Sequence, residues 1–287
     1  MMETTLLKKG MFIMLKLSRM KQIILIFLIF SSQINAQELF VFSEPASNMP
    51  TGSLGIRMGQ SLMKESFSSG YNYHLMPEVM FGINKNLMFH TTAFMSNRAN
   101  NLVTEGGSLY AKYRFLSLDD LHSHFRMAFF GRFSRNNSDI HQEEIETMGH
   151  NSGYELGFIA TKLAKKIAIN ASFSFEKAMD NKPNFDFPNN QSNNASNYTF
   201  SIGRLVYPKQ YSSLKQTNLN VMLEVLGQNL NQNGKSFLDI APSLQFIILS
   251  QARIDLAYRQ QLYSSMLRTA PNGIYLKMEY IFFNIKK

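Results

Sequence analysis

The 287-residue chain has no cysteine and no tryptophan, and only 17% of its residues are charged. Without cysteine it can form neither a disulfide nor a thiolate metal site. Any aromatic ring at a membrane surface must therefore come from its 24 Phe and 12 Tyr residues. The formal charge of +9 also misleads, because residues 1–36 hold five basic side chains and one acid, which leaves +5 for the rest. Those charges are scattered, so no nucleic-acid partner is predicted.

Residues 1–36 have the organisation of a secretory leader. A short positive region at Met20 precedes the apolar run Ile23–Phe30, and Ala36 suits the position before a signal-peptidase cut. We predict cleavage after Ala36, with Met20 as the true start and residues 1–19 as a dispensable extension. An N-terminal membrane anchor is the alternative, but eight apolar residues are too few for a spanning helix, which needs about 20.

The chain after the leader lacks any apolar run near 18 residues and instead alternates apolar with polar residues. The alternation is clearest in Ile167–Glu176, where five apolar side chains share one face and mostly polar ones share the other. A period of two indicates strands rather than helices. The predicted strands are residues 53–63, 71–83, 87–95, 109–115, 125–133, 153–163, 167–176, 196–207, 218–226, 237–248, 252–261 and 274–283. Pro77 and Pro242 predict a bulge or a strand end, because each removes a ladder hydrogen bond.

The gaps between these strands alternate between long and short. The longer gaps, such as 136–152 and 180–195, are rich in Asn, Ser, Gly and Asp, whereas the gaps 84–86, 164–166 and 249–251 are short. Long outer loops and short periplasmic turns are typical of outer-membrane barrels. The prediction is therefore all-β: residues 53–287 form one antiparallel transmembrane barrel of twelve strands, with ten or fourteen as alternatives. A soluble sandwich also alternates, but it gives no reason for alternating gap lengths.

The polar face of the predicted strands would line the lumen. It carries eight basic and seven acidic side chains, a near balance that favours ion pairs across a narrow barrel over a ring of one sign that selects ions. The predicted lumen-lining residues are Arg57, Glu78, Lys112, Arg114, Arg126, Arg132, Glu155, Glu176, Glu224, Asp239, Arg253, Asp255, Arg259, Lys277 and Glu279.

Methionine and histidine gather between residues 74 and 95. His74, Met76, Met80, Met88 and His90 would all face the lumen, and thioether and imidazole groups suit Cu(I). The plainer interpretation, which we favour, is that methionine fills gaps in the lumen. None of the six histidines lies in a catalytic motif, so the sequence predicts no enzyme and no cofactor.

Residues 37–52 precede the first predicted strand. They contain the apolar run Leu39–Phe42, and Pro45 and Pro50 exclude a regular element. We expect a periplasmic segment that is either tucked into the mouth of the barrel or in contact with a periplasmic partner.

Four stretches carry a family resemblance. The leader end Asn35-Ala36-Gln37, the stretches Ser236–Phe246 and Ala252–Tyr258, and the terminal aromatic strand together resemble uncharacterised, loosely transporter-like outer-membrane barrels of Bacteroidetes-type bacteria. The resemblance implies an outer-membrane location and passage of a small solute.

The sequence thus predicts a monomeric narrow channel or transporter. The alternative is a non-conducting structural or adhesive barrel that binds through its outer loops, and copper handling is a minor one. The expected partners are outer-membrane lipid and, during biogenesis, the barrel-assembly machinery.

Overall fold

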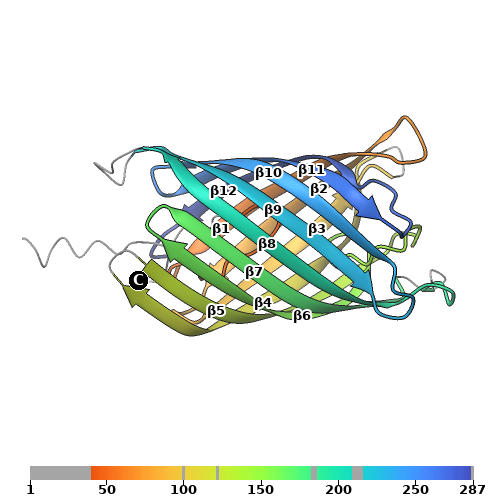
Figure 1. The fold of residues 1–287 in the computed structure, drawn as a ribbon, viewed down its shortest axis with the longest axis horizontal. Helices are drawn as coiled ribbons and strands as arrows, with labels where there is room; N and C mark the ends of the chain where they lie inside the picture. Colours follow the sequence, from red (N-terminus) through yellow and green to blue (C-terminus); the bar gives the residue numbers. More distant parts are fainter. Residues whose placement is uncertain (1–39, 99–100, 121–122, 182–185, 209–215, 286–287) are drawn as a thin grey trace, which may run out of the picture. The chain divides into compact units, whose positions relative to one another are not determined.

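In the computed structural model, residues 40–98, 101–120, 123–181, 186–208 and 216–285 are described. They form twelve antiparallel strands in a closed barrel, in which β1 pairs with β12 (Figure 1). The strands are β1 (Leu54–Lys64), β2 (Tyr71–Gly82), β3 (Leu87–Ser96), β4 (Val103–Asp120), β5 (Ser123–Asn136), β6 (Ser152–Ala164), β7 (Ile167–Met179), β8 (Asn194–Tyr207), β9 (Asn218–Leu230), β10 (Ser236–Ile248), β11 (Ala252–Ser264) and β12 (Asn272–Phe282). The predicted twelve-strand all-β barrel is confirmed, while the predicted leader lies outside the described residues.

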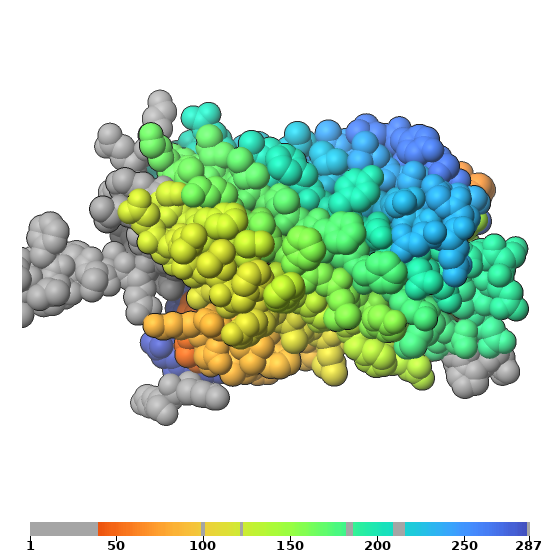
Figure 2. Space-filling model, turned by 60° about the horizontal axis from the view of Figure 1, so that its bottom comes forward, coloured from red at the N-terminus to blue at the C-terminus, as the bar shows by residue number. Residues whose placement is uncertain are grey.

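Alternation sorts the side chains between the two faces of the barrel wall. On β7, Ile169 and Phe173 are exposed on the outside, whereas Asn170 and Glu176 are buried inside. This is the reverse of a soluble sandwich, and it suits a wall that faces lipid. The strands cross the outer face as contiguous oblique bands (Figure 2). No helix among the described residues is long and apolar enough to cross a bilayer.

The short connections are tight turns. Between β10 and β11, Leu249 and Ser250 both have positive φ, and Gln251 N donates to Ile248 O at 3.1 Å. Two consecutive positive φ values are typical of the type I′ turns that match the twist of a hairpin.

Two expectations about strand ends need correction. The gap between the predicted strands 109–115 and 125–133 is too long, because β4 continues to Asp120 and β5 begins at Ser123. Neither proline ends its strand. At both Pro77 and Pro242, pairing continues on one side of the strand and lapses on the other, toward β3 and β11 respectively. Proline has no backbone N–H to donate, so its presence interrupts the pairing with one neighbouring strand only.

The lumen holds two chain segments that are not part of the wall. Residues 40–52, which we call the N-terminal segment, enter from the end of the short turns. Residues 137–151, the loop between β5 and β6, which we call the inserted loop, enter from the opposite end. Each hydrophobic cluster found among the described residues includes one of these segments: Phe40 and Val41 pack on Met222, and Ile145 packs on Leu230. The barrel therefore gains its apolar packing from what fills it.

Candidate functional site

Glu224 of β9 binds the backbone of the N-terminal segment. Its carboxylate is fully buried and accepts hydrogen bonds from Val41 N at 2.8 Å, Phe42 N at 3.1 Å and Ser43 N at 3.0 Å. Ser43 Oγ donates a fourth bond at 2.9 Å. Charge-assisted hydrogen bonds are about twice as strong as neutral ones, so one wall carboxylate holds three consecutive residues of the segment.

Two lysines bind the carbonyl groups of the same segment. Lys112 Nζ, on β4, donates to Pro45 O at 2.7 Å and to Ser47 O at 2.8 Å, and its side chain is fully buried. Lys277 Nζ, on β12, donates to Val41 O. The segment thus meets wall cations through its carbonyls and a wall anion through its amides.

Glu44 extends the binding to side chains. Arg57, on β1, lies 3.1 Å from Glu44 and 2.8 Å from each of Glu78 and Glu279. Arg253 lies 3.0 Å from Glu279. Desolvating buried charges is costly, and a guanidinium shared by several carboxylates offsets this cost only when each ion pair is well formed. Because Glu44 forms one of these pairs, it is an integral part of the charge balance of the wall.

Gly82 allows the segment to reach the wall. A Cβ atom at this position would lie 2.1 Å from Pro50 O, and Gly52 N donates to Gly82 O at 2.7 Å. No side chain fits there, so the glycine at the end of β2 lets residues 50–53 turn into the lumen.

The inserted loop binds the opposite half of the wall through its own backbone. Gln228, on β9, forms two bonds with Ile145: its oxygen accepts from Ile145 N at 3.0 Å, and its Nε2 donates to Ile145 O at 2.7 Å. Thr147 N donates to Glu176 Oε1 at 2.6 Å. Both contacts satisfy buried backbone groups that have no strand partner.

Glu144 joins the inserted loop to a network of arginines. It lies 2.7 Å from Arg268 and 3.2 Å from Arg259, and both arginines also bind Asp239. Burial alone would raise the pKa of Glu144, but Arg268 and Arg259 hold it below its ordinary value. Despite burial, Glu144 and the hydrogen bond to Asp239 raise the pKa of Arg268. Glu144 and Arg268 are therefore both charged at neutral pH.

A second charged cluster lies at the end of the inserted loop. Arg98 lies 2.6 Å from His150 Nδ1, the His150 ring is 4.8 Å from that of His74, and His150 Nε2 is 3.4 Å from Glu146. Burial, His74 and Arg98 hold the pKa of His150 well below its usual range, so this ring is neutral. Burial and the Glu144 carboxylate raise the pKa of Glu146 to about 7.

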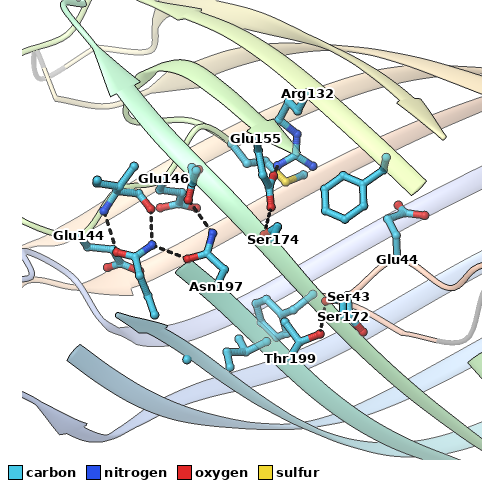
Figure 3. A pocket seen from close by; sticks show the side chains of 18 of the residues that line it. Ser43, Glu44, Arg132, Glu144, Glu146, Glu155, Ser172, Ser174, Asn197 and Thr199 are labelled. Atoms are coloured by element: carbon cyan, nitrogen blue, oxygen red, sulfur yellow. Dashed lines mark hydrogen bonds and ion pairs between the residues drawn. The ribbon is translucent and has the colours of Figure 1, made fainter. Parts of the chain in front are cut away.

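Three cavities lie along the lumen. An outer cavity of about 410 Å³ is lined by Arg98, Asn72 and Thr269 among others. A middle cavity of about 190 Å³ shares Asn72 and Thr269 with the outer one. An inner cavity of about 180 Å³ shares Glu146 with the middle one and extends to Ser43 and Glu44 of the N-terminal segment (Figure 3). The three cavities thus adjoin from the rim of the long loops down to the N-terminal segment.

The structure distributes the predicted charged residues over these contacts. Eleven of the fifteen are buried, and four are partly exposed: Arg114, Arg126, Arg132 and Lys277. Arg114 donates to Lys85 O at a turn, and Arg126 pairs with Asp119 and with Ser47 Oγ near the short-turn end. Arg132 pairs with Glu155 at 3.0 Å, and Arg253 with Asp255 at 3.0 Å. Ion pairs across neighbouring strands and inserted segments account for most of the charge.

The predicted copper ligands do not form one group. His74 and Met76 line the middle cavity, whereas Met80 and Met88 pack on Met49, and His90 lies against Tyr110. Among the described residues, no cluster of three or more His, Cys, Asp or Glu is placed to hold a metal ion. Copper handling stays a prediction.

Four residues that form these contacts were not predicted from the sequence. Glu44, Glu144 and Arg268 all belong to connecting segments, and Gln228 is uncharged. The sequence did contain a signal for the burial of Glu44. The apolar run before Glu44 must be buried, and a barrel with a lipid-facing exterior offers only its lumen for this. Nothing comparable marks Arg268, because its partners come together only in the folded barrel.

Comparisons with known proteins agree with this architecture. No protein-family model and no curated protein sequence matches the chain. Among solved structures, an outer membrane channel from Pseudomonas putida F1 is similar, with a TM-score of 0.55 and 12% identity over 84% of this chain and 99% of that one. The NanC porin has a TM-score of 0.46 and 12% identity over 80% of this chain and 98% of that one. The chain therefore has the closed β-barrel fold that the outer membrane channel from Pseudomonas putida F1 also has.

Proposed function

We propose that the protein is a narrow outer-membrane channel for a small solute, closed by its N-terminal segment and narrowed by its inserted loop. The observation that carries this proposal is the set of three adjoining cavities that ends at the N-terminal segment. A wall of twelve strands encloses more than its own side chains fill. Here the remaining space is occupied by two segments that can leave without opening the wall.

Conductance tests this proposal. In planar bilayers the full-length protein should show small or rare current steps, and a variant lacking residues 40–49 should show large, steady ones. The control is Gln232→Ser in the exposed β9–β10 turn, whose contacts are with Ser192 and Asn193 of the neighbouring loop. That control should conduct like the full-length protein.

The competing function is a non-conducting structural or adhesive barrel. The dense buried ion pairs around Arg57 and Glu144 favour it, because such networks rigidify a core once every member is satisfied. A folded barrel that lacks residues 40–49 and still passes no current would reject the channel and leave this alternative.

A further inference from the structure

The inner cavity holds two carboxyl groups that no cation pairs with. Glu155 is matched by Arg132, and Glu144 and Asp239 are matched by Arg259 and Arg268. Glu146 and Glu176 line the same cavity, and no lysine or arginine of the described residues forms an ion pair with either. The cavity therefore has two carboxyl groups to which a cation could bind.

The partners of these two carboxylates are neutral. Glu176 accepts hydrogen bonds from Thr147 N at 2.6 Å and from Asn197 Nδ2 at 2.7 Å, while it stands directly opposite Glu155 in the register of β6 and β7. Like charges in directly opposite positions are destabilising. Glu146 lies 3.4 Å from the neutral His150 ring, and the arginines that act on it, such as Arg259 and Arg268, are paired with other acids. A cation in this cavity would supply the charged partner that both carboxyl groups lack.

The middle cavity supplies independent evidence for a ligand. Asn72 Oδ1 and His74 Nε2 line it without a hydrogen-bond partner, although their residues are 7% and 5% exposed. An unpaired buried acceptor costs about 1–3 kcal/mol. Because Glu146 lines both cavities, these two atoms and the unmatched carboxylate face adjoining space.

The remaining lining favours an organic cation over a metal ion. Tyr110 and Phe130 stack at 5.6 Å beside the inner cavity, and Phe42 meets Tyr275 at 4.5 Å between the two. Aromatic faces attract ammonium groups, and Ile145 and Leu226 offer apolar surface for an alkyl chain.

We propose that the middle and inner cavities bind a small organic ammonium ion, held by Glu146, Glu176 and the acceptor Asn72. The inference rests on the proposed function only where it identifies this ion as the transported solute. Binding of the ion does not depend on conduction. Each ammonium N–H then finds a carboxylate or amide oxygen, and the alkyl part lies on the aromatic faces.

Calorimetry on the full, detergent-solubilised barrel tests this site. The probes are 1,4-diaminobutane, butylamine, 1-butanol and butyrate. We expect both amines to bind at least tenfold more tightly than the alcohol or the acid. Equal binding of the four probes, or no amine binding, overturns the proposal.

Matched variants locate the site. The double variant Glu146→Gln/Glu176→Gln should weaken binding of 1,4-diaminobutane at least tenfold. Asp186→Asn removes an exposed acid that lines neither cavity, so it should change binding less than twofold. Unchanged affinity in the double variant overturns the proposal.

Proton release gives a readout that misfolded variants cannot imitate. Glu146 is surrounded by Glu144, Arg259, Arg268 and Arg132, and burial raises its pKa to about 7. An amine that binds the carboxylate must displace its proton, so titration of the wild-type protein at pH 7 in buffers of different ionisation enthalpy should show a released proton. At pH 8.5 the number of protons released should be smaller. If the deletion lacking residues 40–49 conducts and no amine binds, this inference fails alone; if amines bind and nothing conducts, only the channel fails.

Discussion

The two segments inside the barrel differ in how many of their contacts are shared between backbone and side chains, and in how their ends are attached. The N-terminal segment is held mainly through its backbone, where Glu224 accepts its amides and Lys112 donates to its carbonyls. The inserted loop is held through its backbone at Ile145 and also through side chains, with Glu144 bound to Arg268 and Glu143 bound to Lys235. Moreover, β5 and β6 tether both ends of the loop, so its release gains less chain entropy. We therefore expect the N-terminal segment to leave the lumen more readily than the loop.

The largest increase in exposure of the N-terminal segment is expected when Glu224 is substituted. Glu224→Gln keeps one side-chain oxygen as an acceptor, where the segment uses both carboxylate oxygens. Hydrogen bonds from Val41, Phe42 or Ser43 are then lost, and the side-chain NH2 group of the glutamine points at backbone N–H groups. At about 1.5–3 kcal/mol for each bond to a charged group, the segment should leave the lumen at least tenfold more often. Because the chain has no cysteine, Ser47→Cys in this background reports exposure by its rate of maleimide labelling.

The control for Glu224 is another buried acid that touches only its neighbours in the wall and loops. Glu105→Gln on β4 alters contacts with Ser96 and Arg98 and should leave the labelling rate of Ser47→Cys unchanged. Equal labelling of both variants would show that the segment is not bound through Glu224.

A smaller effect is expected at Lys112. Lys112→Met removes the donor to Pro45 O and Ser47 O and weakens the balance of Glu44, so the open fraction in single-channel recordings should rise several-fold. Arg114→Met removes a cation from the same strand, but one that binds only Lys85 O at a turn. If both variants open the channel alike, the effect is one of lumen charge rather than of the bound segment.

The inserted loop should respond less to the loss of one contact. Gln228→Leu leaves both backbone groups of Ile145 unpaired, which costs about 1–3 kcal/mol each at most. Arginines and tethered ends still hold the loop, so labelling of Met148→Cys should rise only a few-fold. Gln232→Leu, in the adjacent turn, contacts Asn193 and Ser192 and should have no effect. A rise above that seen for Glu224→Gln would reverse the comparison.

The smallest expected effect is that docking of the inserted loop depends on pH. Burial raises the pKa of Glu146 to about 7, so its proton is bound more tightly when the loop is docked. A raised carboxyl pKa favours docking at low pH, and this advantage is lost as pH rises from about 4.5 through 7. In the variant lacking residues 40–49, conductance should therefore rise modestly between pH 5.5 and 8.5. Glu146→Gln should flatten the profile, and a fall in conductance with pH would contradict the sign.

Much of the barrel could be predicted because its rules are local. Alternation over Ile167–Glu176 sets which side chains face lipid, and the short gap at 249–251 permits only a tight turn. The extent of β4 and β5 was underestimated, because strand pairing continues into Leu118–Asp120, where alternation no longer marks a buried face. Strand ends depend on the neighbouring strand, which no single segment encodes.

The sequence by itself predicted an all-β barrel of about twelve strands and the polar face of its wall, because a period of two and alternating gap lengths follow from local geometry. Only the tertiary structure decided what the charges on that face do. Glu224 reads as a lumen charge in the sequence, yet it binds the backbone of residues 41–43. Glu144 and Arg268 meet from two loops 124 positions apart. Closure of the barrel brings such groups into one low-dielectric space, where each must find a partner.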